Sequence, residues 1–185
     1  NGRDLKNIGK KYYEQLLQEM GVLFQGGALF DSMNVKENVK FPMTMLTNMS
    51  EKEKEKRAEF CLERVNLSHA HNLFPSQISG GMKKRVAIAR AIALNPKDLF
   101  CDEPNSGLDP KTSLVIDQLI HVITQEYKIT TVINTHDMNS VMEIGDTISF
   151  IYQGKLWCRG SNKEILNTNN IEINELVYAS TYAKA

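Results

Sequence analysis

The sequence of 185 residues has no excess of charge of either sign. Lysine plus arginine and aspartate plus glutamate number 22 each, so the formal net charge is zero. A protein that binds nucleic acid or an anionic membrane through its overall charge carries a clear basic excess. We therefore expect no nucleic acid partner, and any contact with a charged surface has to be local.

Cysteine is scarce, and long apolar runs are missing. Cys61, Cys101 and Cys158 are odd in number and lack the spacing of a metal site, which favours reduced, buried thiols in a cytosol over a disulfide framework. No apolar run reaches the roughly 20 residues of a membrane-spanning helix. With 42% apolar residues, the chain can fill one core, or a core domain with a smaller satellite.

Hydrophobic periodicity and turn residues predict a mainly helical section followed by alternating strands and helices. Pro42 is expected to stop the second helix, and a linker is expected at residues 43–50. The strand, helix and strand between residues 98 and 134 predict a βαβ crossover in a parallel sheet, and hence an α/β fold. The expected helices are 10–20, one capped by Asn34 and Glu37, one capped by Ser50 and Glu53, 79–94, 111–127, 138–144 and one capped by Ser161 and Glu164; the expected strands are 20–24, 98–103, 129–134 and two around 153–155.

Asp102 and Glu103 end a short apolar strand, and ligands of open α/β sheets lie beyond the carboxyl ends of the strands. One carboxylate there can hold a hydrated Mg²⁺, while the next can accept a proton from attacking water. Taken alone, the pair is equally well an exposed acidic turn before Pro104. His136 and Gln25 end two further strands, where each is either a structural side chain or a group that contacts phosphate, Mg²⁺ or water.

Ser79, Gly80 and Gly81 begin a basic, alanine-rich helix. The serine can cap the helix, and the two glycines leave its free backbone N–H groups open at the positive end of the helix dipole. This is half of an anion site. Asp109, before Pro110, caps the next helix or belongs to an ordinary turn.

The order of these parts resembles the ATP-binding subunits of ABC transporters. In that family Gln25 corresponds to the Q-loop, residues 78–82 to the signature, residues 99–103 to the Walker B strand, residues 106–109 to the D-loop and His136 to the H-loop. The resemblance implies a P-loop NTPase-like ABC core with a helical subdomain. It divides the chain into residues 1–34 with the Q-loop, 35–95 with the signature, 96–160 with Walker B, D-loop and H-loop, and a C-terminal helical tail at 161–185.

The resemblance also implies the roles of the site residues. Glu103 is then the general base, with His136 and Gln25 as further catalytic residues, and Asp102 and Gln25 contact Mg²⁺. Ser79, Gly80, Gly81 and Asp109 bind the nucleotide of a second ATPase subunit, so that two chains enclose two ATP molecules.

The pattern G-x-x-x-x-G-K-[ST], which holds nucleotide phosphates, does not occur in the sequence. We expect it upstream of Asn1, in a longer protein, and we expect the 185-residue chain alone to be inactive. The alternative is a non-catalytic partner module that naturally lacks the loop.

Residues 21–42 and 79–96, with Met82 in place of the usual Gln, resemble the ATPases of MCE-type lipid importers, the maintenance-of-lipid-asymmetry group. Asn105 replaces the usual Thr, and this leaves lipoprotein release and other ABC systems open. The implied partners are transmembrane permease subunits and an MCE-domain lipid-binding protein. The implied location is the cytoplasmic, inner face of the cell membrane, reached through the permease.

Overall fold

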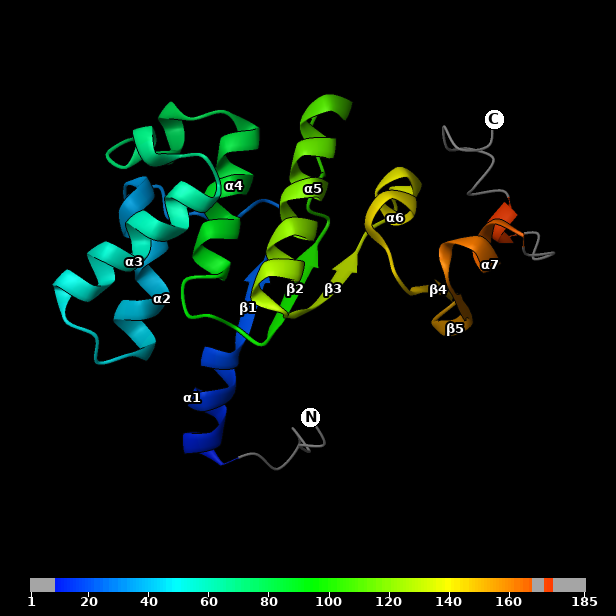
Figure 1. Cartoon of the computed structure of the whole chain (residues 1–185), viewed down its shortest axis with the longest axis horizontal. Coiled ribbons are helices and arrows are strands. Elements are labelled where there is room, and N and C mark those ends of the chain that lie inside the picture. Colours follow the sequence, from blue (N-terminus) through cyan, green and yellow to red (C-terminus); the bar gives the residue numbers. More distant parts are fainter. Residues whose placement is uncertain (1–8, 168–171, 175–185) are drawn as a thin grey trace.

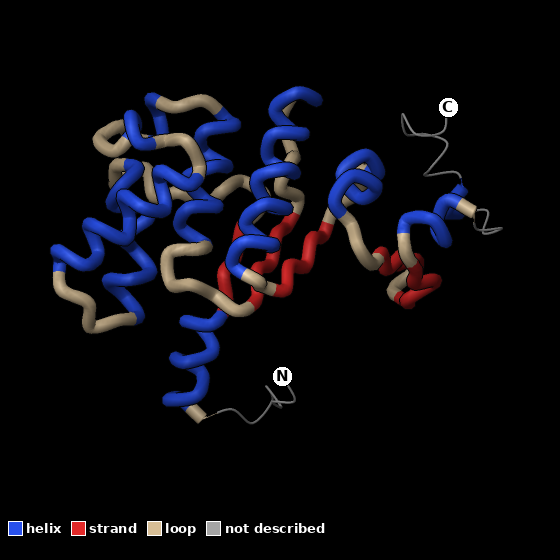
Figure 2. The backbone as a smooth tube through the Cα atoms, in the orientation of Figure 1, coloured by secondary structure: helices blue, strands red, loops and turns tan. Residues whose placement is uncertain are grey.

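The computed structural model describes residues 9–167 and 172–174 (Figure 1). A helical section lies on one side of a small central sheet, and a further helix with a β-hairpin lies on the other side (Figure 2). The elements are α1 Lys10–Glu19, β1 Met20–Leu23, α2 Val35–Leu46, α3 Glu51–Arg64, η2 Ser68–Ala70, η3 Pro75–Gln77, α4 Gly80–Ala91, β2 Asp98–Asp102, α5 Pro110–Tyr127, β3 Thr130–Asn134, α6 Met138–Ile144, β4 Ile148–Tyr152, β5 Lys155–Gly160 and α7 Asn162–Leu166.

The central sheet has the strand order β1-β2-β3, and both strand pairs are parallel. This confirms the predicted parallel sheet. Gly21 lets α4 approach β1 closely, because a Cβ at this position would lie 2.5 Å from the backbone oxygen of Ala91. Because both strand pairs are parallel, all three strands run in one direction and their carboxyl ends meet at one edge of the sheet.

The two faces of the sheet differ in burial. Leu23, Leu99 and Cys101 are buried on the face that packs against the helices. On the other face Val22, Phe100 and Val132 stand in register across the three strands. Phe100 is 37% exposed and Val132 is 51% exposed. Parallel sheets are normally covered on both faces, whereas this face is partly open to solvent among the described residues.

The helical section forms as its capping residues predict. Asn34 with Glu37 and Ser50 with Glu53 each make a full capping box, at the starts of α2 and α3. The expected apolar face of α3 is wholly buried. Its members are Ala58, Cys61, Leu62 and Val65.

The prediction that Pro42 ends its helix is wrong. α2 continues through Pro42 to Leu46, so the loop before α3 is shorter than the expected linker at residues 43–50. A proline inside a helix removes the hydrogen bond to the carbonyl four residues earlier, here that of Asn38, at a cost of about 3 kcal/mol. Val39 and Met43 are both fully buried on either side of Pro42, and this continuous apolar face favours the helix beyond the proline.

The C-terminal part follows the predicted order of elements. α6 ends at Ile144 with Gly145 as its C-cap, and β4 and β5 pair as an antiparallel hairpin. Residues 1–8 of the first expected section, and 168–171 and 175–185 of the expected helical tail, lie outside the described residues. In the part of the chain that is described, every helix is too short or too polar to cross a membrane.

The three thiols are free, as expected. Cys61 and Cys101 are buried, and burial raises the pKa of Cys61 to about 11 and that of Cys101 to about 12. Cys158 is only half-buried, so the expectation of three core thiols is correct for two of them.

Candidate active site

The parallel strands bring four predicted site residues to one edge of the sheet. Asp102 ends β2, and Glu103 follows it directly. Gln25 lies two residues beyond the end of β1, and His136 lies two residues beyond the end of β3. These four residues lie near one another because parallel strands place all their carboxyl ends at the same edge of the sheet.

Glu103 and His136 are in direct contact. The Oε1 atom of Glu103 lies 2.9 Å from Nδ1 of His136 and also accepts the backbone N–H of His136 at 3.1 Å. The side chain of Glu103 is 18% exposed, whereas that of His136 is 85% exposed. The hydrogen bond to the Glu103 carboxylate, helped by its charge, raises the pKa of His136 above its ordinary value. The contact orients a carboxylate whose second oxygen can serve as a proton acceptor.

Asp102 is exposed, and its Oδ1 accepts a hydrogen bond of 2.8 Å from Nδ2 of Asn134. No group of three or more His, Cys, Asp or Glu side chains that could hold a metal is found among the described residues. Mg²⁺ commonly binds only one or two protein carboxylates and completes its shell with water and substrate phosphates. Asp102, with the amide of Gln25 nearby in the fold, therefore fits Mg²⁺ of this kind and does not fit a closed metal site.

Gln25 is held from two directions. Its Nε2 atom donates to the hydroxyl of Ser106 at 3.3 Å, and its backbone oxygen accepts a hydrogen bond from the buried ammonium of Lys84. Lys84 also donates to the backbone oxygen of Glu103 at 3.1 Å. Lys84 was not predicted as a site residue, and Ser106 was predicted only as a member of the D-loop segment 106–109. Lys84 is one of several basic residues in the range 83–90, and nothing in the sequence pattern distinguishes it from the others.

The residues predicted to form half of an anion site lie at the N-terminus of α4. Ser79 caps the helix by accepting the N–H of Met82 at 3.2 Å. A cavity of about 590 Å³ is lined by Ser79, Gly80 and Gly81 together with Asp109. Hydrogen bonds from the side chain and backbone of Thr112 to Asp109 lower the pKa of this carboxyl group.

Glu103 and His136 do not belong to the described lining of that cavity. The structure thus groups the predicted residues into two sets within one chain. The first set lies at the carboxyl edge of the sheet, and the second lies at the start of α4 and α5.

A buried polar cluster lies behind the Glu103 segment. Nδ2 of Asn105 donates to Asp117 and to Ser140 at 2.8 Å each, and the Ser140 hydroxyl donates to the other Asp117 oxygen at 2.8 Å. Burial raises the pKa of Asp117, although its two hydrogen bonds oppose the shift. The cluster joins the Glu103 segment to α5 and α6. Asn105, noted in the sequence only as a departure from a family pattern, is therefore a central structural residue.

Known proteins resemble this chain in both sequence and structure. Methionine import ATP-binding protein MetN 1 of Oceanobacillus iheyensis is 40% identical over 170 residues, which cover 92% of this chain and 50% of the relative. The protein of the same name from Pseudomonas putida is 36% identical, over 89% of this chain and 49% of the relative. The chain thus spans about half the length of these relatives.

A solved dimeric structure of the ATP-binding cassette MJ0796, in a post-hydrolysis state bound to ADP and Pi, superimposes with a TM-score of 0.77. It is 31% identical, and the match covers 88% of this chain and 71% of the cassette. This match confirms the predicted fold class. The family model described as ABC transporter matches residues 1–106, more than half of the chain. The chain therefore belongs to the ABC transporter family.

Proposed function

We propose that this chain is part of an ATP-hydrolysing motor subunit of an ABC transporter. The observation that carries the proposal is the Glu103 carboxylate, oriented by His136 at the same sheet edge as Asp102 and Gln25. This arrangement occurs in a chain that belongs to a family of ATP-driven transporters.

Glu103 acts as the general base in this proposal, because its partly buried carboxylate can accept the proton of a water molecule that attacks the γ-phosphate. His136 holds Oε1 of Glu103, which leaves the other carboxylate oxygen for that proton. Asp102 and Gln25 are the residues that would hold Mg²⁺. When bound, Mg²⁺ would neutralise charge on the phosphates.

Ser79, Gly80 and Gly81 would bind the nucleotide of a second copy of the chain. The N-terminus of α4 is exposed at Ser79 and Gly80, and its free N–H groups suit an anion. In one chain these residues line a cavity separate from the Glu103 and His136 pair. The solved MJ0796 cassette is described as a dimer with ADP and Pi, which supports a two-chain arrangement. Asp109 would contribute to this interface from the start of α5.

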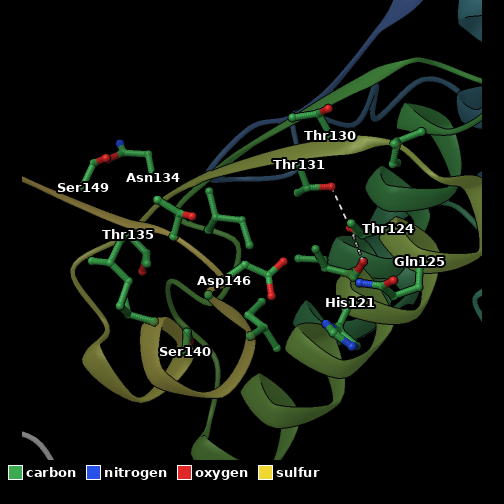
Figure 3. A pocket seen from close by; sticks show the side chains of 18 residues that line it. His121, Thr124, Gln125, Thr130, Thr131, Asn134, Thr135, Ser140, Asp146 and Ser149 are labelled. Carbon is green, nitrogen blue, oxygen red and sulfur yellow. Dashed lines mark hydrogen bonds between the residues drawn. The ribbon is translucent and has the colours of Figure 1, made fainter. Parts of the chain in front are cut away.

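The phosphate-binding loop would come from a part of the full protein outside this sequence. Two features support the proposal of an additional strand and helix. In the apolar row of Val22, Phe100 and Val132, Phe100 and Val132 are exposed and Val22 is partly exposed. A groove of about 410 Å³ runs beside β3, where Thr131 and Asn134 are among the lining residues that Figure 3 labels.

The test is to compare this chain with the full reading frame for nucleotide binding and Mg²⁺-dependent phosphate release. We expect activity only in the longer protein, because phosphoryl transfer depends on positioning and charge neutralisation by the phosphate loop. Equal hydrolysis by the short chain would contradict the assigned site. A full reading frame without such a loop would instead favour the alternative of a non-catalytic partner module.

The motor subunit would act at the inner, cytoplasmic face of the cell membrane, bound to permease subunits. The two relatives named above are methionine importers by name, and this favours import of a small molecule. Lipid transport with an MCE-domain partner, expected from residues 21–42 and 79–96, has no support from these relatives and stands as the alternative cargo, as does lipoprotein release. The cargo can be tested in proteoliposomes that contain the subunit with its copurifying permease. Methionine uptake would support amino acid import, and phospholipid transfer would support lipid transport.

A further inference from the structure

Lys84 is a buried cation whose contacts are backbone carbonyl groups. Its side chain lies in the second turn of α4, the residue is 5% exposed, and its ammonium donates to the backbone oxygens of Gln25 and Glu103. A buried ammonium group is costly unless hydrogen bonds satisfy it. The two carbonyls belong to the two residues that follow neighbouring strands and carry their side chains into the candidate active site.

The backbone of Glu103 needs such support. Its φ angle is +45°, in the left-handed region that a residue with a Cβ rarely adopts and that is costly to maintain. The N–H of Glu103 donates to the backbone oxygen of Asn134 at 2.8 Å, and its C=O accepts from Lys84 at 3.1 Å. Both backbone groups are therefore fixed while the carboxylate reaches His136.

The loop of residues 24–28, which we call the Gln25 loop, lies along the same helix. Arg90 donates to the backbone oxygens of Gly27 at 2.6 Å and Ala28 at 2.7 Å. Gly27 faces α4 closely, since a Cβ there would lie 3.6 Å from the Cβ of Ala87. Positions 84, 87 and 90 follow each other at a spacing of three residues along α4, so the loop is attached at Lys84 and again at Arg90.

We propose that Lys84 is a positioning residue that couples the N-terminus of α4 to both Gln25 and Glu103. Ser79, Gly80 and Gly81 form the start of the helix about one turn before Lys84, so a displacement of this terminus carries the ammonium with it. The backbone of the general base and that of the Gln25 loop then move together. The catalytic part of this inference rests on the proposed function.

The charge of Lys84 suits this position. Burial lowers the pKa of Lys84, whereas the nearby carboxylates of Glu103 and Asp102 act in the opposite direction. The geometric contacts of the ammonium remain those with the backbone oxygens of Gln25 and Glu103.

The test compares Lys84→Met with Lys83→Met in the full-length protein. Methionine keeps the approximate length and apolar character of the lysine stem but removes the donor, and Lys83 is a matched control in the same helical turn. Hydrogen exchange should speed up at least about tenfold at the amides of Gly27 and Glu103 in Lys84→Met alone. In a Lys84→Met variant whose thermal stability is unchanged, kcat should fall about 10- to 100-fold while KM changes little. Misplacement of a catalytic group lowers turnover. Lys84→Arg, which retains donors, should recover part of both effects.

Unchanged amide exchange and unchanged kcat in Lys84→Met would overturn the inference, as would an equal effect of Lys83→Met. If Lys84→Met does not fold, amide exchange and kcat are measured on Lys84→Gln and Lys84→Arg instead. A larger effect in Lys84→Gln than in Lys84→Arg would support the inference, and no effect in either would overturn it. Lack of turnover in the unmodified full-length protein would contradict the proposed function, but the exchange measurement would still show whether Lys84 holds the two backbone segments.

Discussion

A Cβ atom added to Gly81 would lie 2.7 Å from the Cγ2 methyl group of Thr112, so α4 and α5 pack too closely here to accommodate a side chain at position 81. The hydroxyl of Thr112 is fixed by a hydrogen bond of 2.5 Å to Asp109, and a β-branched side chain has few alternative rotamers. Gly81 is therefore needed for helix packing as well as for any contact with phosphate.

We predict that Gly81→Ala destabilises the protein by about 1–3 kcal/mol, the usual cost of overpacking. Gly81→Ala combined with Thr112→Ser should regain most of this loss, since serine lacks the methyl group but retains the hydroxyl for Asp109. Urea unfolding of the two variants and of Thr112→Ser alone checks the prediction. Equal stability of Gly81→Ala and the unmodified protein would show that the contact is not tight.

Gly80 is the better position at which to test the two-chain site. A Cβ at Gly80 would meet Leu108 Cδ2 at an ordinary 3.6 Å, and aspartate is favourable in the first turn of a helix. Gly80→Asp should therefore fold but place negative charge where the partner's nucleotide would bind. We expect loss of ATP-dependent dimerisation in size-exclusion chromatography of the full-length protein, with Gly80→Ala as the uncharged control. Normal dimerisation of Gly80→Asp would contradict the proposed interface.

Glu103→Gln should lower turnover of the full-length protein by roughly two or more decades, the scale of a lost acid-base group. The amide retains the size of the side chain and can still pair with His136, so ATP binding should persist. Phosphate release and nucleotide binding, measured on the same preparation, check both parts. Turnover at the unmodified rate would exclude Glu103 as the general base.

His136 should titrate above its usual pKa of about 6.5. Its pKa is raised in the folded protein, so the stabilising contact with Glu103 is fully present below the unfolded pKa and is lost as pH rises through the folded value. The stabilisation by this contact is thus expected to be lost as the pH rises from near neutral to above the pKa of His136 in the folded protein. Titration by NMR should show the pKa falling towards 6.5 in Glu103→Gln, and an unchanged pKa would mean that the contact is not formed in solution.

Phe30→Asp tests whether the loop before α2 contacts a permease. Phe30 is 40% exposed, and its ring contacts that of Phe41 with centroids 4.5 Å apart and an interplanar angle of 47°. The buried side chain of Asn38 fixes the backbone of Phe30. We expect the variant to fold and to lose copurification with the permease while it retains ATP binding. Phe41→Ala removes the ring that Phe30 contacts and serves as the control. Loss of folding in Phe30→Asp would instead assign Phe30 to the core.

The sequence by itself determined most local features of this protein. Asn34 with Glu37 and Ser50 with Glu53 set two helix starts, because a capping box involves only residues three apart. The grouping of Asp102 and Glu103 with His136 also followed from sequence, since the carboxyl ends of parallel strands must share an edge. Gln25 joined this group only through the resemblance to ABC transporter subunits.

Only the tertiary structure decided how these pieces fit together. Pro42 lies inside a helix whose residues Val39 and Met43 are buried in the core, where α2 packs against α3 and α4. Local propensity does not contain that information. Lys84 binds the carbonyls of Gln25 and Glu103, which lie 59 and 19 residues away along the chain. Asn105 likewise meets Asp117 and Ser140 only when α5 and α6 pack together. Such contacts depend on the relative placement of whole elements, because a side chain selects its partners only after packing has brought them within hydrogen-bonding distance.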